Sequence, residues 1–255
     1  LSQSKTVSVA RESPTQISNF QSNPQDTTTR VGKSIVGEAD EASETAVQSA
    51  TYRAYELMQA TVHVVTVPVG TPLSVASAEE LMTVEAFSQQ EDAVAVINAG
   101  FFDPQNGKTT SHITVSGQVV GDPADNERLV DNLTLQPYLP QILNRSEFRV
   151  YLCGPDAVTR YDITFHNALW PDDCDLEHAV GAGPQLLPAD TSEAEAFTDY
   201  ENGELIRDAI GSMQLNARSA VGIDENGLLY LLMVEKNADS AGLTLAALAD
   251  FGASL

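Results

Sequence analysis

The sequence has few basic residues and no long apolar run. Its 13 lysines and arginines stand against 36 aspartates and glutamates, so the formal net charge is −23. A surface of this charge repels nucleic acid and anionic lipid headgroups, which argues against both as partners. No apolar stretch approaches the roughly 20 residues that a membrane-spanning helix needs. The sequence therefore predicts no membrane span.

Cysteine is also scarce, since only Cys153 and Cys174 are present. The chain begins at Leu1 without an initiator methionine, as processed or excised chains do. An even cysteine count in such a chain favours one disulfide and a secreted or periplasmic location. The bridge would stabilise the fold by ~3 kcal/mol. Two free thiols are the alternative. No metal site is expected, because the pair Cys174 and His178 has no second ligand pair.

The chain does have enough apolar residues for a core. It contains 255 residues, of which 42% are hydrophobic, which suits one large domain or two small ones. Residues 1–50 are rich in serine, threonine, glutamine and asparagine, and cannot bury enough surface to offset the entropy of ordering. They are expected to form a flexible or extended arm, with a possible role in docking a protein partner. Residues 51–255 are expected to form the domain.

Strand patterns outnumber helix patterns in that domain. Hairpins are expected at residues 52–67, 112–120 and 219–235, the last around Asn226-Gly227, and a buried strand at residues 93–97. Helices are expected at residues 79–89, with Ser77 as N-cap, and at residues 192–197 and 243–251. Residues 122–160 are expected to be irregular. The sequence thus predicts an α+β fold with a mostly antiparallel or mixed β-sheet core and a few packed helices.

The segment that follows the strand at residues 93–97 carries the clearest chemical signal. It consists of an amide, two small residues, two aromatics and a carboxylate, from Asn98 to Asp103. Small residues let the backbone approach a ligand closely, and polar and aromatic groups together often line sugar and phosphate pockets. The alternative is a strand that enters a tight turn and places its phenylalanines in the core.

Four segments together resemble one known family. The stretch INAGFFDPQNG, residues 97–107, is similar to the N-(G/A)-G-F-F-(D) signature of the phosphodiester glycosidases, whose animal member uncovers mannose 6-phosphate on lysosomal enzymes. Similar segments follow in the family's order: SHITVSG at residues 111–117, GAGPQLL at 181–187 and ARSAVGI at 217–223. The resemblance covers about residues 60–255. It implies an extracytoplasmic hydrolase, without a cofactor, that cleaves a sugar joined through its anomeric oxygen to phosphate in a glycan or glycolipid.

The resemblance also implies which residues act. A phosphate monoester is a stabilised leaving group, so cleavage asks less of a general acid than an ordinary glycoside does. Arg218 is the expected phosphate clamp, since a guanidinium can grip two phosphate oxygens. Groups that orient and wall the sugar are expected at Asn98, Gly100, Phe101, Phe102 and Gly183.

Proton transfer has two nearby candidates, Asp103 and His112. Asp103 precedes a proline and otherwise starts a turn, and His112 otherwise is a structural histidine. Relatives carry an aspartate in a D-G-R segment near Glu235, where this chain has Glu235-Lys236-Asn237. The other histidines, His63, His166 and His178, are expected to be structural or at the surface.

The sequence given ends before the N-L-D-G-G motif that the family places after a segment like residues 242–249. Together with the altered Glu235 segment, this leaves two interpretations open. One is a glycosidase whose C-terminal part is not included. The other is a non-catalytic module that binds glycan phosphates, or a structural subunit of an extracellular assembly.

Overall fold

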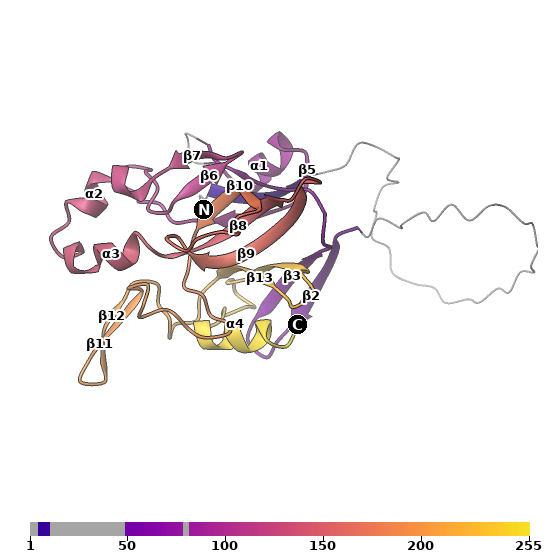
Figure 1. Ribbon diagram of the computed structural model, residues 1–255. Coiled ribbons are helices and arrows are strands. Elements are labelled where there is room, and N and C mark those ends of the chain that lie inside the picture. Colours follow the sequence, from indigo (N-terminus) through magenta and orange to yellow (C-terminus); the bar gives the residue numbers. More distant parts are fainter. Residues whose placement is uncertain (1–4, 11–48, 79–81) are drawn as a thin grey trace, which may run out of the picture. The chain divides into compact units, whose positions relative to one another are not determined.

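The computed structural model describes residues 5–10, 49–78 and 82–255, and the first of these segments by its backbone alone. Within these residues the strands pair into four sheets, and every pairing is antiparallel (Figure 1). The helices are few and short. The α+β architecture predicted from the sequence is confirmed. None of the described helices is long and apolar enough to cross a membrane.

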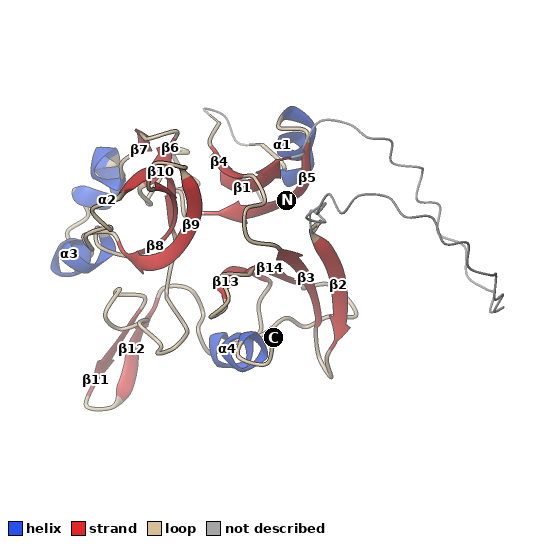
Figure 2. Cartoon of the chain, turned by 45° about the vertical axis from the view of Figure 1, so that its right-hand side comes forward, coloured by secondary structure: helices blue, strands red, loops and turns tan. Residues whose placement is uncertain are grey.

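A four-stranded sheet combines two strands from the start of the predicted domain with two strands from near its end. Its order is β13-β14-β3-β2, and its strands are β2 (Thr51–Glu56), β3 (Thr61–Val67), β13 (Arg218–Ile223) and β14 (Leu229–Val234). Alternating β-branched and aliphatic residues give this sheet two apolar faces. The helix α4 (Leu245–Gly252) packs Leu248 and Phe251 on one face, against Val62 and Val234 (Figure 2). The hairpins expected at residues 52–67 and 219–235 and the helix at 243–251 are confirmed.

A three-stranded sheet holds the strand that leads into the signature segment. Its order is β4-β1-β5, with β4 (Leu73–Ala76), β1 (Lys5–Ala10) and β5 (Ala93–Ala99). The central strand β1 thus comes from the predicted arm at residues 1–50. Residues 1–4 and 11–48 of that arm lie outside the described residues, so its expected role stays a prediction.

The helix before β5 is shorter than expected. It is α1 (Val84–Gln90), and the hydroxyl of Thr83 accepts a hydrogen bond from the Ala86 N–H and so caps its start. The expected cap at Ser77 is therefore wrong, and residues 79–81 lie outside the described part of the chain. A nearer threonine takes the cap because its side chain reaches the first free amides of the helix.

A five-stranded sheet, of order β7-β6-β10-β8-β9, fills the middle of the chain. Its strands are β6 (Ile113–Val115), β7 (Gln118–Gly121), β8 (Ser146–Cys153), β9 (Val158–Phe165) and β10 (Cys174–Gly181). The hairpin expected at residues 112–120 is confirmed. The expectation of an irregular segment at residues 122–160 is wrong for its second half, which contains β8 and the start of β9. The sequence hides β8, because this strand buries two charged residues, Glu147 and Arg149.

Short helices occupy the stretch before β8. They are η1 (Pro123–Asp125), α2 (Glu127–Val130), η2 (Gln136–Tyr138) and α3 (Leu139–Ile142). The helix expected at residues 192–197 is also wrong, since the chain there makes turns around the buried carboxylate of Glu195. Beyond it, β11 (Thr198–Glu201) and β12 (Glu204–Asp208) form a two-stranded hairpin that stands apart from the larger sheets (Figure 2).

The predicted disulfide is present. Cys153 ends β8 and Cys174 begins β10, and the two residues lie opposite each other in the antiparallel register. Both side chains are buried, and Tyr151 and Leu176 pack beside them. The bridge therefore fastens the ends of two paired strands rather than two loops.

The main core joins the three larger sheets. Its buried residues are Val67, Leu73, Val75, Ile97, Ile113, Phe148, Val150, Val180, Leu229 and Leu231. On the four-stranded sheet this core uses only one end of the face opposite α4. At the other end of that face, the register places Ser219, Met233 and His63 in one row. This row is left partly open to solvent, and Met233 is 40% exposed.

Candidate functional site

The signature segment folds tightly against the segment around Gly181. Gly100 has a φ of +73°, and a Cβ added there would lie 3.5 Å from Val180 Cγ2 and 3.6 Å from the Gly181 carbonyl. The next residue, Phe101, donates its N–H to Ser111 Oγ at 2.8 Å. Three of the four family-like segments, which contain Gly100, Ser111 and Gly181, are thus in direct contact.

Phe101 faces an aromatic and cationic cluster. Its ring centroid is 5.6 Å from that of Phe197, and the Arg145 guanidinium lies 3.7 Å from the Phe197 centroid. Burial lowers the pKa of Arg145 to about 10. Phe102 is half-buried and forms a bridge with Thr109. A role for either phenylalanine as a wall of the sugar site stays a prediction.

Gly183 makes room for a buried carboxylate. A Cβ there would lie 2.1 Å from Glu195 Oε2, and the residue has a φ of +83°. Glu195 is fully buried and accepts hydrogen bonds from the Ser146 N–H and hydroxyl and from the Gln185 N–H. Only glycine fits this position. The expected contact between the Gly183 backbone and a ligand stays a prediction.

Asp103 lies in the turn that follows the signature phenylalanines. Its Oδ1 accepts the Gln105 N–H at 2.8 Å, and its Oδ2 accepts from Arg128 Nε at 2.6 Å. The bond from Gln105 and the guanidinium of Arg128 hold the pKa of this carboxyl below its usual range. At neutral pH Asp103 is therefore ionised and cannot donate a proton.

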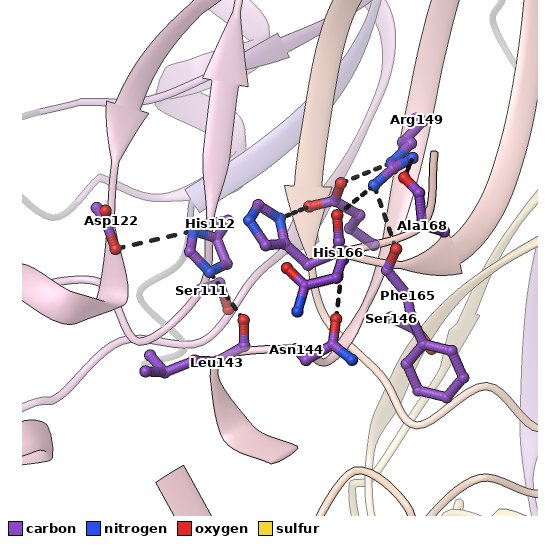
Figure 3. Close-up of polar contacts among 12 residues, drawn as sticks. Ser111, His112, Asp122, Leu143, Asn144, Ser146, Arg149, Phe165, His166 and Ala168 are labelled. Carbon is purple, nitrogen blue, oxygen red and sulfur yellow. Dashed lines mark hydrogen bonds and ion pairs between the residues drawn. The ribbon is translucent and has the colours of Figure 1, made fainter. Parts of the chain in front are cut away.

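His112 stacks on a second histidine that the sequence did not single out. The rings of His112 and His166 are parallel within 3° and their centroids are 3.5 Å apart (Figure 3). We call this pair the histidine stack. His112 Nε2 donates to the Leu143 carbonyl at 3.0 Å, and its Nδ1 is 3.8 Å from Asp122 Oδ1. Burial and the neighbouring His166 lower the pKa of His112.

A buried ion pair lies behind the histidine stack. His166 Nδ1 is 3.0 Å from Glu147 Oε2, and Arg149 Nε donates to Glu147 Oε1 at 2.6 Å. Arg149 is 1% exposed, and its other N–H groups donate to the carbonyls of Phe165, His166 and Ala168 (Figure 3). It also donates to Tyr151 Oη. This network anchors the segment after β9 and leaves little donor capacity for a ligand.

Arg218 is surrounded by backbone oxygens. It donates to the carbonyls of Ile210, Gly211, Gln214 and Leu243. Burial lowers the pKa of this guanidinium. In the sheet Arg218 lies opposite Val234, so both side chains point to the face that α4 covers. Its neighbour Ser219 points to the opposite face.

Asn98 reaches that opposite face. Its Oδ1 accepts a hydrogen bond from the Ser219 hydroxyl, which joins the signature segment to the ARSAVGI segment. The structure thus brings Asn98 and Ser219 together, and places the Arg218 guanidinium on the other side of the sheet. Phosphate recognition by Arg218 stays a prediction.

A hydrogen-bonded chain of three side chains lies along the same face. His63 Nδ1 is 2.7 Å from Tyr52 Oη, and His63 Nε2 is 2.7 Å from Glu235 Oε1. The His63 and Glu235 side chains are 23% and 32% exposed. We call Tyr52, His63, Asn98, Ser219 and Glu235 the sheet-end cluster. The sequence did not reveal His63, because Glu235 is 172 residues away.

A hollow of about 520 Å³ opens elsewhere, lined by Tyr138, Gln141, Asp190, Glu193, Ala194, Thr198 and Asp199. It contains none of the residues that the sequence singled out, and its three carboxylates would repel a phosphate. Across the described ranges no group of three or more histidine, cysteine or acidic residues is arranged to hold a metal ion.

Comparisons with known proteins identify a family and a fold. Residues 91–255 match the family described as phosphodiester glycosidase. The chain belongs to this family. No curated protein matches it.

Among solved structures, the fold is similar to the zebrafish N-acetylglucosamine-1-phosphodiester alpha-N-acetylglucosaminidase catalytic domain, described as auto-inhibited by pro-peptide. The TM-score is 0.56 and the sequence identity 16%, over 84% of this chain and 69% of that chain. At this identity the likeness shows a shared fold.

Proposed function

We propose that this protein hydrolyses a sugar-1-phosphodiester outside the cytoplasm, and that the sheet-end cluster is part of its active site. Membership of the phosphodiester glycosidase family supports the reaction class. The position of the active site is inferred from the hydrogen bond between Asn98 and Ser219. This bond joins two family segments more than 100 residues apart on a partly open face of the sheet. The same face carries His63 and Glu235, which can hold and move a proton.

The reaction asks for limited chemistry. A water oxygen bonds to the anomeric carbon while the bond from that carbon to the phosphate oxygen breaks, and the electron pair leaves with the phosphate monoester. The protein has to orient the sugar and accept one proton from the water. The Asn98 amide and the Ser219 hydroxyl suit sugar hydroxyl groups, since both can donate and accept hydrogen bonds.

The other residues expected from the sequence keep their roles within this proposal. Gly100 and Gly183 present backbone donors, Phe101 and Phe102 line the sugar, and Asp103 and His112 are the candidates for proton transfer that compete with His63. Asp103 can act only as a base or as a fixed charge, because it is ionised.

Arg218 lies across the sheet from the sheet-end cluster, so in this proposal it grips the phosphate only if it gives up bonds to carbonyls and reaches around the edge strand β13. Arg218→Ala and Arg218→Lys separate the two roles of this side chain. Phosphate recognition predicts a raised KM in both variants, and loop support alone predicts a lower midpoint of unfolding with an unchanged KM. An unchanged KM in both variants would remove Arg218 from the site.

The location outside the cytoplasm is supported by the disulfide, which oxidising compartments maintain. Thiol titration of the protein isolated under non-reducing conditions tests it. Two reactive thiols in the denatured protein would contradict an oxidised Cys153–Cys174 pair.

The direct test is hydrolysis of N-acetylglucosamine 1-(methyl phosphate) and of other sugar-1-phosphodiesters by the full chain in water enriched in ¹⁸O. Cleavage at the anomeric carbon places the label in the released sugar. Label in the phosphate would show phosphorus–oxygen cleavage and contradict the proposal.

A second candidate function is the non-catalytic module that binds glycan phosphates. The Glu235-Lys236-Asn237 segment favours it, because relatives carry D-G-R there. Tight binding of the same diesters in a calorimeter without turnover would select this candidate.

A further inference from the structure

We infer that His63, oriented by Glu235, is the general base that takes the proton from the attacking water. The inference rests on the proposed hydrolysis and names a residue for it. His63 lies on β3, and Glu235 follows the last residue of the adjacent strand β14. Water, His63 and Glu235 would then act as nucleophile, base and orienting carboxylate, as in other hydrolytic triads.

The carboxylate of Glu235 is held in place from several sides. The Glu235 N–H donates to the Thr61 carbonyl at 3.0 Å, and its own carbonyl accepts from the Ser240 hydroxyl at 2.7 Å. Asn237 Nδ2 donates to Glu235 Oε2 at 2.8 Å, which leaves Oε1 directed at His63. The orientation of the imidazole is therefore fixed before any substrate binds.

These contacts determine which nitrogen of His63 is free to act. An ionised carboxylate only accepts hydrogen bonds, so Nε2 carries the proton that bonds Glu235. Nδ1 then has a lone pair, and the Tyr52 hydroxyl donates to it at 2.7 Å. Tyr52 is 64% exposed and lies on the edge strand β2. Its hydroxyl occupies the place that an attacking water needs, and its exposure lets it move away.

The sheet sets the distance between His63 and the pair Asn98 and Ser219, which we propose binds the sugar. Ser219, Met233 and His63 lie directly opposite one another on three adjacent strands. Two interstrand spacings place Ser219 and His63 roughly 10 Å apart. A sugar ring over the apolar Met233 side chain would reach Asn98 and Ser219 with its hydroxyl groups and direct its anomeric carbon towards His63.

The step balances without a co-reactant. As the water oxygen bonds to the anomeric carbon, one water proton passes to His63 Nδ1, and the phosphate monoester leaves with the electron pair of the broken bond. Glu235 stabilises the resulting imidazolium, which then loses its proton to solvent. The titratable groups on this face around His63 are Tyr52 and Glu56 of β2 and Glu235.

The test measures kcat and KM of His63→Gln and Glu235→Gln in the full chain, with a sugar-1-phosphodiester as substrate. His63→Gln is expected to lower kcat by about 10²–10⁴-fold. Glu235→Gln is expected to lower kcat with little change in KM, because the imidazole loses the acceptor that orients it. The matched control is His178→Gln in β10, a buried histidine outside the cluster, which should keep kcat within about twofold.

The outcomes separate this inference from the proposed function. If the wild type turns over and His63→Gln keeps its kcat, the inference is overturned and the hydrolase proposal stands. If the wild type shows no turnover, the proposed function fails and the inference falls with it. Should His63→Gln not fold, Glu235→Gln decides, since an unchanged kcat overturns the inference and a lowered kcat at a similar KM supports it.

Discussion

The histidine stack and the sheet-end cluster use the same side chains in different surroundings. Each pairs an imidazole with a glutamate, His166 with Glu147 and His63 with Glu235. Glu147 is 3% exposed and also binds the buried Arg149, whereas Glu235 lies at a partly open edge. The difference lies behind the imidazole: the buried Glu147–Arg149 pair, whose guanidinium uses all its donors, holds the fold together. Within the described part of the chain the His63–Glu235 pair contacts no such cation, and it has a displaceable neighbour in Tyr52, which suits it to chemistry.

The largest expected effect concerns the buried ion pair between Glu147 and Arg149. Arg149→Met leaves the Glu147 carboxylate in the interior without its guanidinium, which should lower the free energy of unfolding by about 3–5 kcal/mol. Urea denaturation monitored by circular dichroism measures it. Arg128→Met is the matched control, since Arg128 is 51% exposed and its loss should cost far less. Equal losses in the two variants would show that burial does not distinguish these ion pairs.

A second prediction concerns Gly183, which packs against the buried Glu195. Alanine there would place a methyl group on a carboxylate that several donors hold in place, and should cost about 3 kcal/mol or more. Gly203 has the same φ of +83° with nothing within 4 Å of an added Cβ. Gly203→Ala should therefore cost only the backbone strain of about 1–2 kcal/mol. The same urea titration compares the two, and equal midpoints would contradict the packing at Gly183.

The sequence predicted the hairpins well, because their signals are local. Partly alternating β-branched or aromatic residues indicated β2 and β3, and Asn226-Gly227 indicated the turn between β13 and β14. The strand β8 escaped prediction, because a buried arginine looks like a surface residue until its carbonyl partners are known. The turns around Glu195 were also missed, because a buried glutamate looks like a surface residue until its hydrogen-bond donors are known.

The candidate site was predicted only where it lies within one segment. The signature pointed to Asn98, but its partner Ser219 comes from a strand 121 residues later. The sequence does not point to His63, since its partners Tyr52 and Glu235 meet it only through the pairing of β2, β3 and β14. The register of the first hairpin could have suggested the contact with Tyr52, because Tyr52 lies diagonally from His63 across it.

The smallest expected effect is a pH dependence of stability. Burial and His166 place the pKa of His112 in the folded protein below its ordinary value of 6.5. Folding therefore favours neutral His112, and this stability is complete above about pH 6.5 and is lost as the pH falls towards the lowered pKa. His112→Gln should reduce the difference in unfolding free energy between pH 7.5 and 5.5, measured by urea titration. The share that comes from His178 should remain, since its pKa is lowered as well.

Measurements of His112→Gln at the same two pH values show whether His112 accounts for this pH dependence. His112→Gln keeps a donor for the Leu143 carbonyl, so its stability at pH 7.5 should change little. An undiminished pH dependence in this variant would contradict a lowered pKa of His112 in the folded protein.

The most direct measurement uses the small number of histidines in the chain. Its four imidazoles, at residues 63, 112, 166 and 178, give separable ¹⁵N signals in a long-range correlation spectrum of the full chain. A non-hydrolysable sugar 1-phosphonate diester is the probe. If the sheet-end cluster binds the sugar phosphodiester, the His63 nitrogens shift on titration, and those of His112 and His166 do not. Shifts at His112 and His166 with His63 unmoved would contradict this account.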